Sequence, residues 1–482
     1  MLFHEPVFLV FFAIVFPVYL LVRKNNRLMN GWFMIASYVF YGYWYWPYIV
    51  LLFSTSAIDY LMVVLMERRE KTRKLWLIIS LVSNFGLLGY FKYSTFLTGN
   101  INWAFETMHL GLHLPDPVAY PNAVLTLFGV SQNHLFREVL LPIGISFHTF
   151  QSMSYTIDAY YGNIKTEKSF VRFLTFVSFF PQLVAGPIER ASNLLPQLQG
   201  TPEIKRDDVY DGASLFLIGY FKKVALADYL SLYVDRVYGS PSDFDAGALV
   251  LATVAFAWQI YFDFSGYTDM ARGLAQIMGF RMMLNFNNPY VATGLGDFWS
   301  RWHISLSTWF KDYVYFPLGG NRRGKLITYR NMFITMVVSG IWHGAAWTYV
   351  VWGLLHAIGR CATRELESTA WYRDRVPRLL KQAFVFSFVC LAWIFFRARS
   401  MADASAVLKG IFTKRWGDPQ FPILMGVLLA AVWLYEEFFA RGEKTRRILE
   451  WEPARMGVAV AMVTWLAVVA APSSASFIYF QF

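Results

Sequence analysis

The chain has 482 residues, of which 56% are hydrophobic and 16% are charged, with a formal net charge of +11. Soluble domains are about 45–50% apolar and about 25% charged, so the composition excludes intrinsic disorder, a collagen-like repeat and a disulfide scaffold, and it disfavours an ordinary soluble enzyme. Aromatic residues make up 19% of the chain, which together with the basic balance is typical of an integral membrane protein with aromatic belts.

The basic residues stand in short clusters between apolar segments, beginning with residues 23–27 and 68–74. Such clusters hold the loops of a multispanning protein in the cytoplasm. Nucleic-acid-binding proteins instead gather their basic residues on one patch or stripe, so no nucleic acid partner is predicted. Cys361 and Cys390 lack a neighbouring Cys or His at metal-ligand spacing, so neither a metal site nor a redox pair is predicted.

Candidate membrane helices follow one another along the whole chain, since a spanning helix needs about 20 mostly apolar residues. They cover residues 7–22, 31–46, 48–66, 75–90, 139–160, 173–186, 210–233, 246–270, 331–359, 383–396, 421–434 and 456–471. Short or broken segments need not cross fully, so we expect an all-α integral membrane protein with about 11 transmembrane helices plus re-entrant and amphipathic helices. No repeat or long linker interrupts them, which predicts one membrane domain over residues 1–482.

The first basic clusters predict the orientation of the N-terminal half. If both are cytoplasmic, the N-terminus is extracytoplasmic, and so is the loop over residues 100–138, whose one basic residue is Arg137. The first apolar segment has no basic stretch before it, so it is not predicted to be a removable signal peptide. Later stretches are all basic, and strict alternation cannot place all of them inside: residues 301–330, 360–381, 397–415 and 441–455. Re-entrant or surface-lying helices, such as one over residues 401–412, would explain this.

His343 is the first candidate for chemistry. It stands two residues from the midpoint of the uncharged run 331–359, so one continuous helix would place it within about 3 Å of the membrane centre. An ionisable side chain there is costly unless it faces protein or a wet cavity. Small residues around it leave room for a substrate or another helix, namely Gly340, Gly344, Ala345 and Ala346. The alternative is a core histidine hydrogen-bonded between helices, and the residues alone leave both interpretations open.

His303 is the second candidate. The segment over residues 297–312 mixes charged, aromatic and hydroxyl groups without a lipid-compatible face, which predicts a re-entrant or cavity-lining element. The alternative is a cytoplasmic amphipathic helix with a solvated histidine. His356 follows His343 by thirteen residues, about 220° around one helix, so the two should not share a face and His356 is interpreted as structural.

The other polar residues of the apolar segments favour ordinary roles. Asp263 and Asp269 are expected to pair with Arg272 or Arg301. Four histidines lie in predicted terminal or loop regions, where a solvated surface position is expected: His4, His109, His113 and His134. No GxSxG, Walker A, HExxH or Rossmann pattern stands in a suitable context, so what remains is histidine acid–base chemistry in a membrane cavity.

Six segments then point to a known family. They are residues 141–151 (LPIGISFHTFQ), 179–190 (FFPQLVAGPIER), 219–228 (GYFKKVALAD), 298–309 (FWSRWHISLSTW), 340–345 (GIWHGA) and 477–482 (FIYFQF). In this order they resemble the membrane-bound O-acyltransferase family, in its bacterial alginate O-acetyltransferase branch. The resemblance implies a ring of tilted helices around a central funnel, with His343 as the catalytic histidine and His303 as the second functional one. Ser300 departs from the pattern, because this branch often has a second basic residue there.

The function implied by the resemblance is acyl transfer across a bacterial inner membrane. The donor would be a cytoplasmic thioester such as acetyl-CoA, with no bound cofactor. The acceptor would be an exported polysaccharide, most of all alginate, or a periplasmic acetyl-carrying partner protein. His343 would act as general base on the attacking hydroxyl, and His303 would orient it or stabilise the oxyanion. Arg322, Arg323 and Lys325 could attract the donor phosphates, although a positive-inside anchor explains them as well.

Other functions stay open at this point. The acceptor could be cellulose or peptidoglycan, and D-alanyl transfer is a further option. A transporter or flippase would move an acyl carrier or glycan without chemistry, and a structural subunit of a polysaccharide synthase would not need its histidines.

Overall fold

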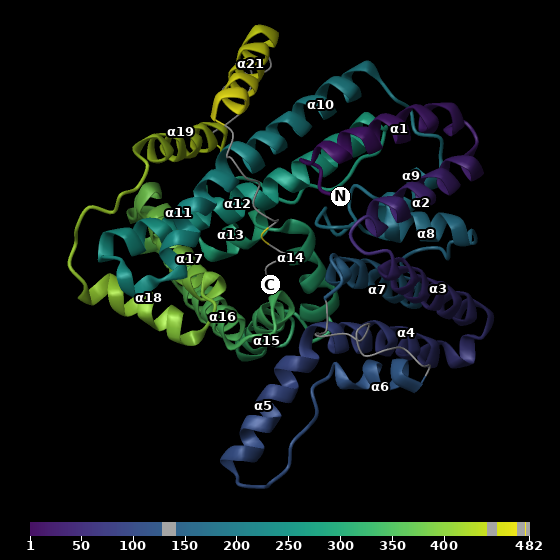
Figure 1. The fold of residues 1–482 in the computed structure, drawn as a ribbon, viewed down its shortest axis with the longest axis horizontal. Helices are drawn as coiled ribbons and strands as arrows, with labels where there is room; N and C mark the ends of the chain where they lie inside the picture. Colours follow the sequence, from purple (N-terminus) through teal and green to yellow (C-terminus); the bar gives the residue numbers. More distant parts are fainter. Residues whose placement is uncertain (128–140, 441–450, 470–477, 479–482) are drawn as a thin grey trace.

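The structure, a computed structural model, describes residues 1–127, 141–440, 451–469 and 478. Within these ranges the regular structure is helical and contains no strand. Figure 1 shows α1 to α4 and α7 to α9 on one side and α11 and α16 to α18 on the other, with α14 between them and α5 projecting away from the bundle. The all-α architecture expected from the sequence is confirmed for the described residues.

The helices have the following bounds. The N-terminal side contains α1 (Pro6–Val22), α2 (Asn26–Gly42), α3 (Pro47–Arg68), α4 (Arg73–Leu88), α5 (Ser94–Thr107), α6 (Ala119–Leu127), α7 (Ile145–Tyr161), α8 (Phe170–Ser178) and α9 (Ala191–Gln199). The other side contains α10 (Arg206–Phe221), α11 (Asp228–Gly239), α12 (Ala246–Ile277), α13 (Leu295–Arg301), α14 (Ile304–Phe310), α15 (Lys325–His343), α16 (Trp347–Ser368), α17 (Arg378–Arg397) and α18 (Met401–Thr413). The last helices are α19 (Ile423–Ala440) and α21 (Glu452–Val469). A π-helical turn, η2 (Gly89–Tyr93), joins α4 to α5.

The long helix α12 forms the centre of the molecule, and glycines let α10 pack closely against it. A Cβ added at Gly219 would meet the carbonyl oxygen of Gly266, and one added at Gly273 would meet that of Gly212. Small residues allow helix backbones to approach in this way, which is the usual means of association where lipid removes the hydrophobic driving force. This packing fixes α10 against the buried central helix.

Four helical stretches are long and apolar enough to cross a membrane: Pro47–Arg68, Glu70–Thr107, Ala246–Ile277 and Arg378–Arg397. The shorter α1 is also apolar. The expected count of about 11 spans is therefore not confirmed within the described residues. The expected span over 173–186 is wrong, because α8 ends at Ser178 and a buried non-helical segment follows. Residues 139–140 and 470–471 of two other expected spans lie outside the described residues.

The uncharged run 331–359 folds as a hairpin of two helices and not as one span. Helix α15 ends at His343, the chain turns through residues 344–346, and α16 begins at Trp347. The ion pair between Lys325 and Glu365 joins the start of α15 to the end of α16, as antiparallel neighbours require. His343 therefore lies at the end of a helix, and the expectation that it stands in the middle of one is wrong.

The hairpin also corrects the angular argument that placed His356 and His343 on different faces of one helix. The centroids of both histidine rings lie close to that of Trp352, His343 at 5.0 Å and His356 at 4.7 Å. The angular argument assumed one continuous helix, and the reversal after His343 removes that assumption. The two side chains share an aromatic neighbour although they belong to different helices.

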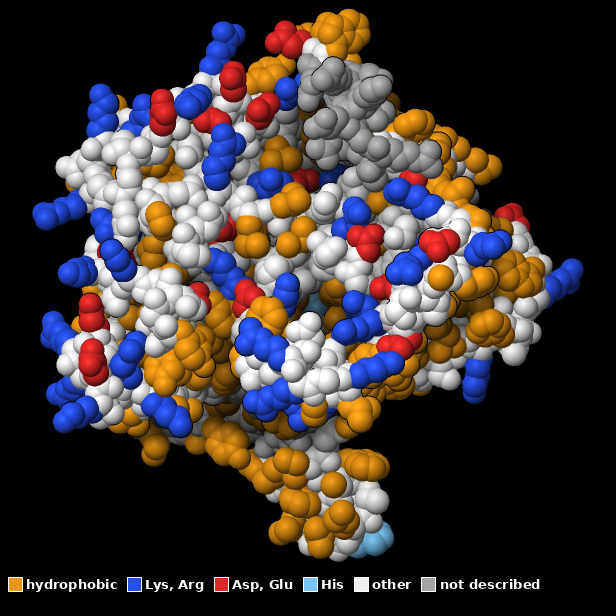
Figure 2. All heavy atoms as spheres, turned by 180° about the vertical axis from the view of Figure 1, so that it is seen from behind, with side chains coloured by type: hydrophobic (Ala, Val, Ile, Leu, Met, Phe, Trp, Pro, Cys, Tyr) orange, Lys and Arg blue, Asp and Glu red, His pale blue; other side chains and the backbone are white. Residues whose placement is uncertain are grey.

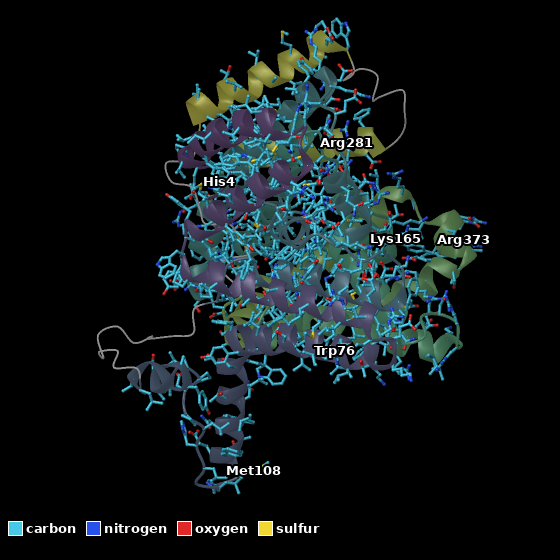
Figure 3. The ribbon with its side chains drawn as sticks, turned by 90° about the vertical axis from the view of Figure 1, so that its right-hand side faces the viewer. His4, Trp76, Met108, Lys165, Arg281 and Arg373 are labelled. Atoms are coloured by element: carbon cyan, nitrogen blue, oxygen red, sulfur yellow. The ribbon has the colours of Figure 1, made fainter. Side chains whose placement is uncertain are left out.

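The basic stretches separate onto two ends of the helical bundle. Arg378 at the start of α17 pairs with Glu437, whereas Arg397 at its far end pairs with Asp235. Residues 360–381 and 397–415 thus lie at opposite ends of α17, so these two basic stretches are not on the same side of the bundle. Figure 3 shows His4 on one side of the bundle and Lys165 and Arg373 on the opposite side. Figure 2 views that second side and shows Lys and Arg side chains spread over it, around a hollow near its centre.

Labelling of single cysteines tests the predicted orientation. Lys71 should be cytoplasmic and Asn122 extracytoplasmic, because basic loops remain inside. We expect Lys71→Cys and Asn122→Cys to react with a membrane-impermeant thiol reagent from opposite sides. A background without Cys361 and Cys390, both free thiols, is the control. Reaction of both positions from the same side would contradict the orientation of the N-terminal half.

Candidate active site

His343 sits in a compact aromatic environment at the end of α15. Its side chain is 4% exposed. The ring meets Trp342, Trp352 and Phe396 edge-on, with centroids at 4.9, 5.0 and 5.2 Å. The following residue, Gly344, is extended, and Tyr349 of α16 packs so closely that a Cβ at Gly344 would overlap its ring. The turn therefore needs glycine after the histidine, and the rings around His343 limit its freedom to rotate.

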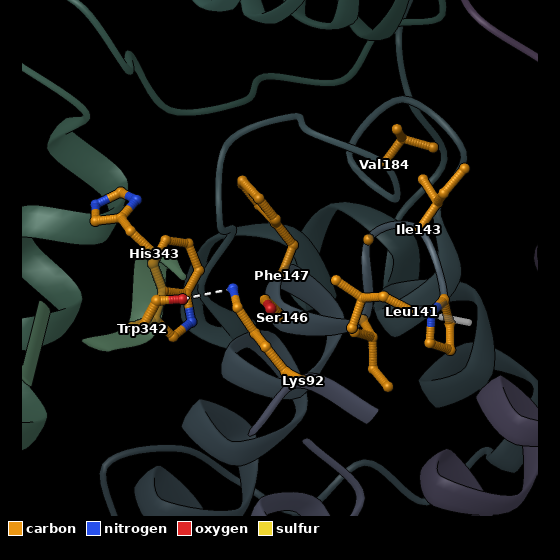
Figure 4. Close-up of a pocket in the computed structure, with 11 residues that line it drawn as sticks. Lys92, Leu141, Ile143, Ser146, Phe147, Val184, Trp342 and His343 are labelled. Atoms are coloured by element: carbon orange, nitrogen blue, oxygen red, sulfur yellow. Dashed lines mark hydrogen bonds between the residues drawn. The ribbon is translucent and has the colours of Figure 1, made fainter. Parts of the chain in front are cut away.

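A cavity of about 80 Å³ lies against His343 (Figure 4). Its walls are Lys92, residues 141–147, Val184, Trp342 and His343. Figure 4 shows His343 and Trp342 on one wall, with Ile143 and Val184 across from them. Three of the segments that carried the family resemblance, 141–151, 179–190 and 340–345, therefore meet at one small space.

A second, larger cavity of about 680 Å³ adjoins the first, because Lys92 and Leu141 line both. It includes the turn after His343 and several charged residues, namely Lys92, Asp235, Arg397 and Arg399. Arg397 pairs with Asp235 at 2.6 Å, while Arg399 is exposed. This cavity lies at the end of the bundle opposite the start of α15. A polar vestibule thus leads toward His343 from the end that the predicted orientation places outside.

His303 is buried between α13 and α14, with an exposed fraction of 1%. It caps the start of α14 with φ of 43°, a left-handed conformation that is uncommon for residues other than glycine. Its Nδ1 lies 3.1 Å from Asn285 Oδ1. The same oxygen accepts the backbone N–H of Ser305, which can only donate, so the orientation of the Asn285 amide is fixed. In neutral His303 the proton then sits on Nδ1, and Nε2 carries the lone pair.

The two histidines belong to one aromatic cluster. Trp342 lies between them, with its ring centroid 6.5 Å from that of His303 and 4.9 Å from that of His343. A solvated cytoplasmic His303 does not fit this burial. The fold thus brings together side chains that are forty residues apart in sequence, although His303 lines neither cavity.

The three basic residues expected at the donor site lie far from His343. Arg322 and Arg323 are exposed, and Lys325 is ion-paired with Glu365. Helix α15 has 19 residues, which puts its first residue about 27 Å from its last. The structure therefore separates these residues from the histidines by nearly a membrane thickness.

Several minor expectations are corrected by the contacts. Asp263 pairs with Lys223 at 2.7 Å and not with an arginine, whereas Asp269 does approach Arg272, at 3.6 Å, besides Lys222. Arg301 pairs with Asp297. His4 is buried and not solvated. His134 and residues 477 and 479–482 lie outside the described residues.

Two residues of the site were not predicted from the sequence, Asn285 and Lys92. Asn285 holds His303, but it stands in an unremarkable loop, and no sequence signal connects it to a histidine eighteen positions later. Lys92 contacts both cavities, and here a signal existed. It is the one charged residue between Lys74 and Glu106, inside an apolar stretch.

Comparison with known proteins gives consistent matches. The family model described as membrane-bound O-acyltransferase matches residues 159–402. A probable alginate O-acetylase of Pseudomonas aeruginosa is 38% identical over 418 residues, covering 86% of this chain and 75% of the relative. A peptidoglycan O-acetyltransferase of Helicobacter pylori is 34% identical, over 85% of this chain and 80% of the relative. A teichoic acid D-alanyltransferase of Bacillus subtilis is 30% identical, over 55% of this chain and 71% of the relative.

Proposed function

The chain belongs to the membrane-bound O-acyltransferase family, and we propose that it transfers acetyl groups from cytoplasmic acetyl-CoA to an exported polysaccharide, with His343 as general base. The position of His343 in the wall of the small cavity carries this proposal. The small cavity, about 80 Å³, is the space beside His343 in which we propose that the acetyl group is held. A bacterial inner membrane is the proposed location.

The proposed chemistry is an acyl transfer at the thioester carbonyl. His343 takes the proton of the acceptor hydroxyl as its oxygen attacks the carbonyl carbon. The tetrahedral oxyanion then collapses, the C–S bond breaks, and the thiolate of CoA leaves and is protonated. General base catalysis of this kind contributes about 10²–10⁴-fold. His303 is held by Asn285 and lines neither cavity, so of its two expected roles we propose orientation of the reacting groups through the aromatic cluster around Trp342. A covalent acyl intermediate that is passed to a periplasmic partner protein fits the same site.

Alginate is the acceptor we favour. The alginate O-acetylase of Pseudomonas aeruginosa is more similar to this chain than the D-alanyltransferase, which matches only 55% of it. The vestibule has three cationic side chains and one acidic one, which suits a polyanionic polysaccharide better than a neutral glucan. Peptidoglycan is the second candidate, because a peptidoglycan O-acetyltransferase matches 85% of the chain.

Purified protein in lipid nanodiscs provides the test. With labelled acetyl-CoA and alginate oligomers, we expect free CoA to appear together with an O-acetyl ester on the oligomer. Ester formation on peptidoglycan fragments, and not on alginate oligomers, would show that the acceptor is peptidoglycan. The same protein is assayed in parallel in proteoliposomes, where exchange of acceptor across the membrane without any CoA release would contradict the enzyme assignment and support a transporter.

Neutralising Arg322, Arg323 and Lys325 together tests the donor end. If they attract the phosphates of acetyl-CoA, we expect the donor KM to rise about fivefold with kcat nearly unchanged, since uniform binding is lost. The matched control removes three charges from the same end of the bundle, at Arg373, Arg375 and Lys381. An unchanged donor KM in correctly inserted protein would leave these residues only the role of a positive-inside anchor.

A further inference from the structure

The turn that joins α4 to α5 is hydrogen-bonded to the end of α15. This turn is π-helical over Gly89–Tyr93, and it presents two successive side chains to the last carbonyls of α15. Lys92 Nζ donates to the Trp342 carbonyl at 2.6 Å, and Tyr93 Oη donates to the Ile341 carbonyl at 2.9 Å. The final carbonyls of a helix have no partner within it and carry partial negative charge, so an ammonium group there is doubly favourable.

A third hydrogen bond joins α5 to the other side of the hairpin turn. Asn100 Oδ1 of α5 accepts the indole N–H of Trp347, the first residue of α16, at 3.0 Å. The three hydrogen bonds therefore hold the last residues of α15 and the first residue of α16, on either side of the turn over residues 344–346. His343 lies between the bonded residues in the chain. Short π-helical turns are frequent at functional sites, and this one contains both Lys92 and Tyr93.

Placing the charged side chain of Lys92 in an apolar stretch costs free energy, and the side chain makes specific contacts there. It lies within the stretch Glu70–Thr107, which is long and apolar enough to cross a membrane. A charged residue in such a stretch points to a function, because its transfer into the membrane must be compensated. Its ammonium lies 5.5 Å from the centre of the Trp342 ring, and its side chain lines both the small cavity and the vestibule.

We propose that Lys92 is a positioning residue for the transfer reaction. The carbonyl it holds belongs to the peptide bond between Trp342 and His343, so the hydrogen bond fixes the plane from which the His343 side chain projects. Loss of that bond would free the last peptide of α15 and widen the range of orientations of the imidazole. A misplacement of about 1 Å in a reacting group can cost about 100-fold in rate, which makes such a support kinetically visible. The inference rests on the proposed function, because it takes His343 as the base.

Variants of Lys92 measured with and without His343 test this role. We expect Lys92→Met to lower kcat about tenfold with the donor KM within about twofold of wild type, because the orientation of His343 is lost and donor binding is not. The acceptor KM should rise, because one of the three cationic side chains of the vestibule is removed. Lys92→Arg, which can still donate to the carbonyl, should recover part of kcat. Tyr93→Phe is the matched control, since it removes only the neighbouring bond, and we expect a loss of no more than about threefold.

A double-mutant cycle separates positioning from an independent effect. In a His343→Gln background, Lys92→Met should cause no additional loss, because both changes act on the same group. A further tenfold drop would overturn the inference, as would a raised donor KM with normal kcat. If Lys92→Met fails to accumulate in membranes, Lys92→Gln takes its place and must give the same pattern. Full activity of Lys92→Met beside an inactive His343→Gln overturns this inference alone, whereas full activity of His343→Gln overturns the proposed function as well.

Discussion

Replacing His343 by Gln is expected to lower acetyl transfer to the polymer by about 100-fold or more, in protein that still folds and inserts. Gln keeps some hydrogen bonding in the cavity wall but cannot accept a proton as imidazole does. With an ordinary pKa of about 6.5, imidazole gains and loses a proton near neutrality, which is what a base for a hydroxyl needs. The measurement is ester-linked acetate on the exported polymer in cells, with membrane abundance checked by immunoblot.

His356 provides the matched control for this substitution. It is also fully buried and packs on the same Trp352. Neither of its ring nitrogens has a hydrogen-bond partner among the described residues, so a change to Gln breaks no bond there. We expect His356→Gln to remain within about threefold of wild type, in the range of ordinary substitutions without a special role. Full transfer by His343→Gln at normal abundance would end the general-base assignment and return His343 to the role of a core histidine.

The sequence predicted the class of the fold well and its path less well. Composition and basic clusters indicated a helical membrane protein, and the segments around His343 and His303 indicated the family. The error over residues 331–359 has a clear cause. The reversal after His343 uses Gly344 and two alanines, which are as apolar as the flanking helices, so hydropathy shows no break where the chain turns. The turn becomes visible only through the packing of α16 back on α15.

The supporting residues of the site could not be predicted in the same way. Lys92 lies in the π-helical turn η2 and reaches Trp342 across 250 positions of sequence. Asn285 reaches His303 through a loop whose course depends on α12 and α14. A pattern search recognises reactive residue types, whereas the groups that orient them are ordinary residues selected by three-dimensional proximity. The second large effect that we predict, that of replacing Asn285, therefore comes from the structure and not from the sequence.

Asn285→Ala is expected to lower kcat between about 10-fold and about 100-fold, as is His303→Gln. The Asn285 oxygen accepts from His303 Nδ1, and that bond determines which ring nitrogen carries the proton. Without it, His303 can adopt the other tautomer and rotate in its left-handed cap, so it no longer presents Nε2 in one direction. Donor and acceptor KM should change little, because neither residue lines a cavity. Steady-state kinetics of the purified protein separates the two constants.

Ser305→Ala distinguishes the histidine from the rest of this small network. The Ser305 hydroxyl donates to the same Asn285 oxygen at 2.9 Å and makes a longer contact of 3.5 Å with His303 Nδ1. Its removal leaves the shorter bond between His303 and Asn285 in place. The backbone N–H of Ser305 continues to fix the amide. We therefore expect Ser305→Ala to stay within about threefold of wild type, the loss of one neutral hydrogen bond. If Ser305→Ala and Asn285→Ala were equally impaired, the effect would come from the local fold around the start of α14. If Asn285→Ala kept a normal kcat, the orientation of His303 would have no part in the reaction.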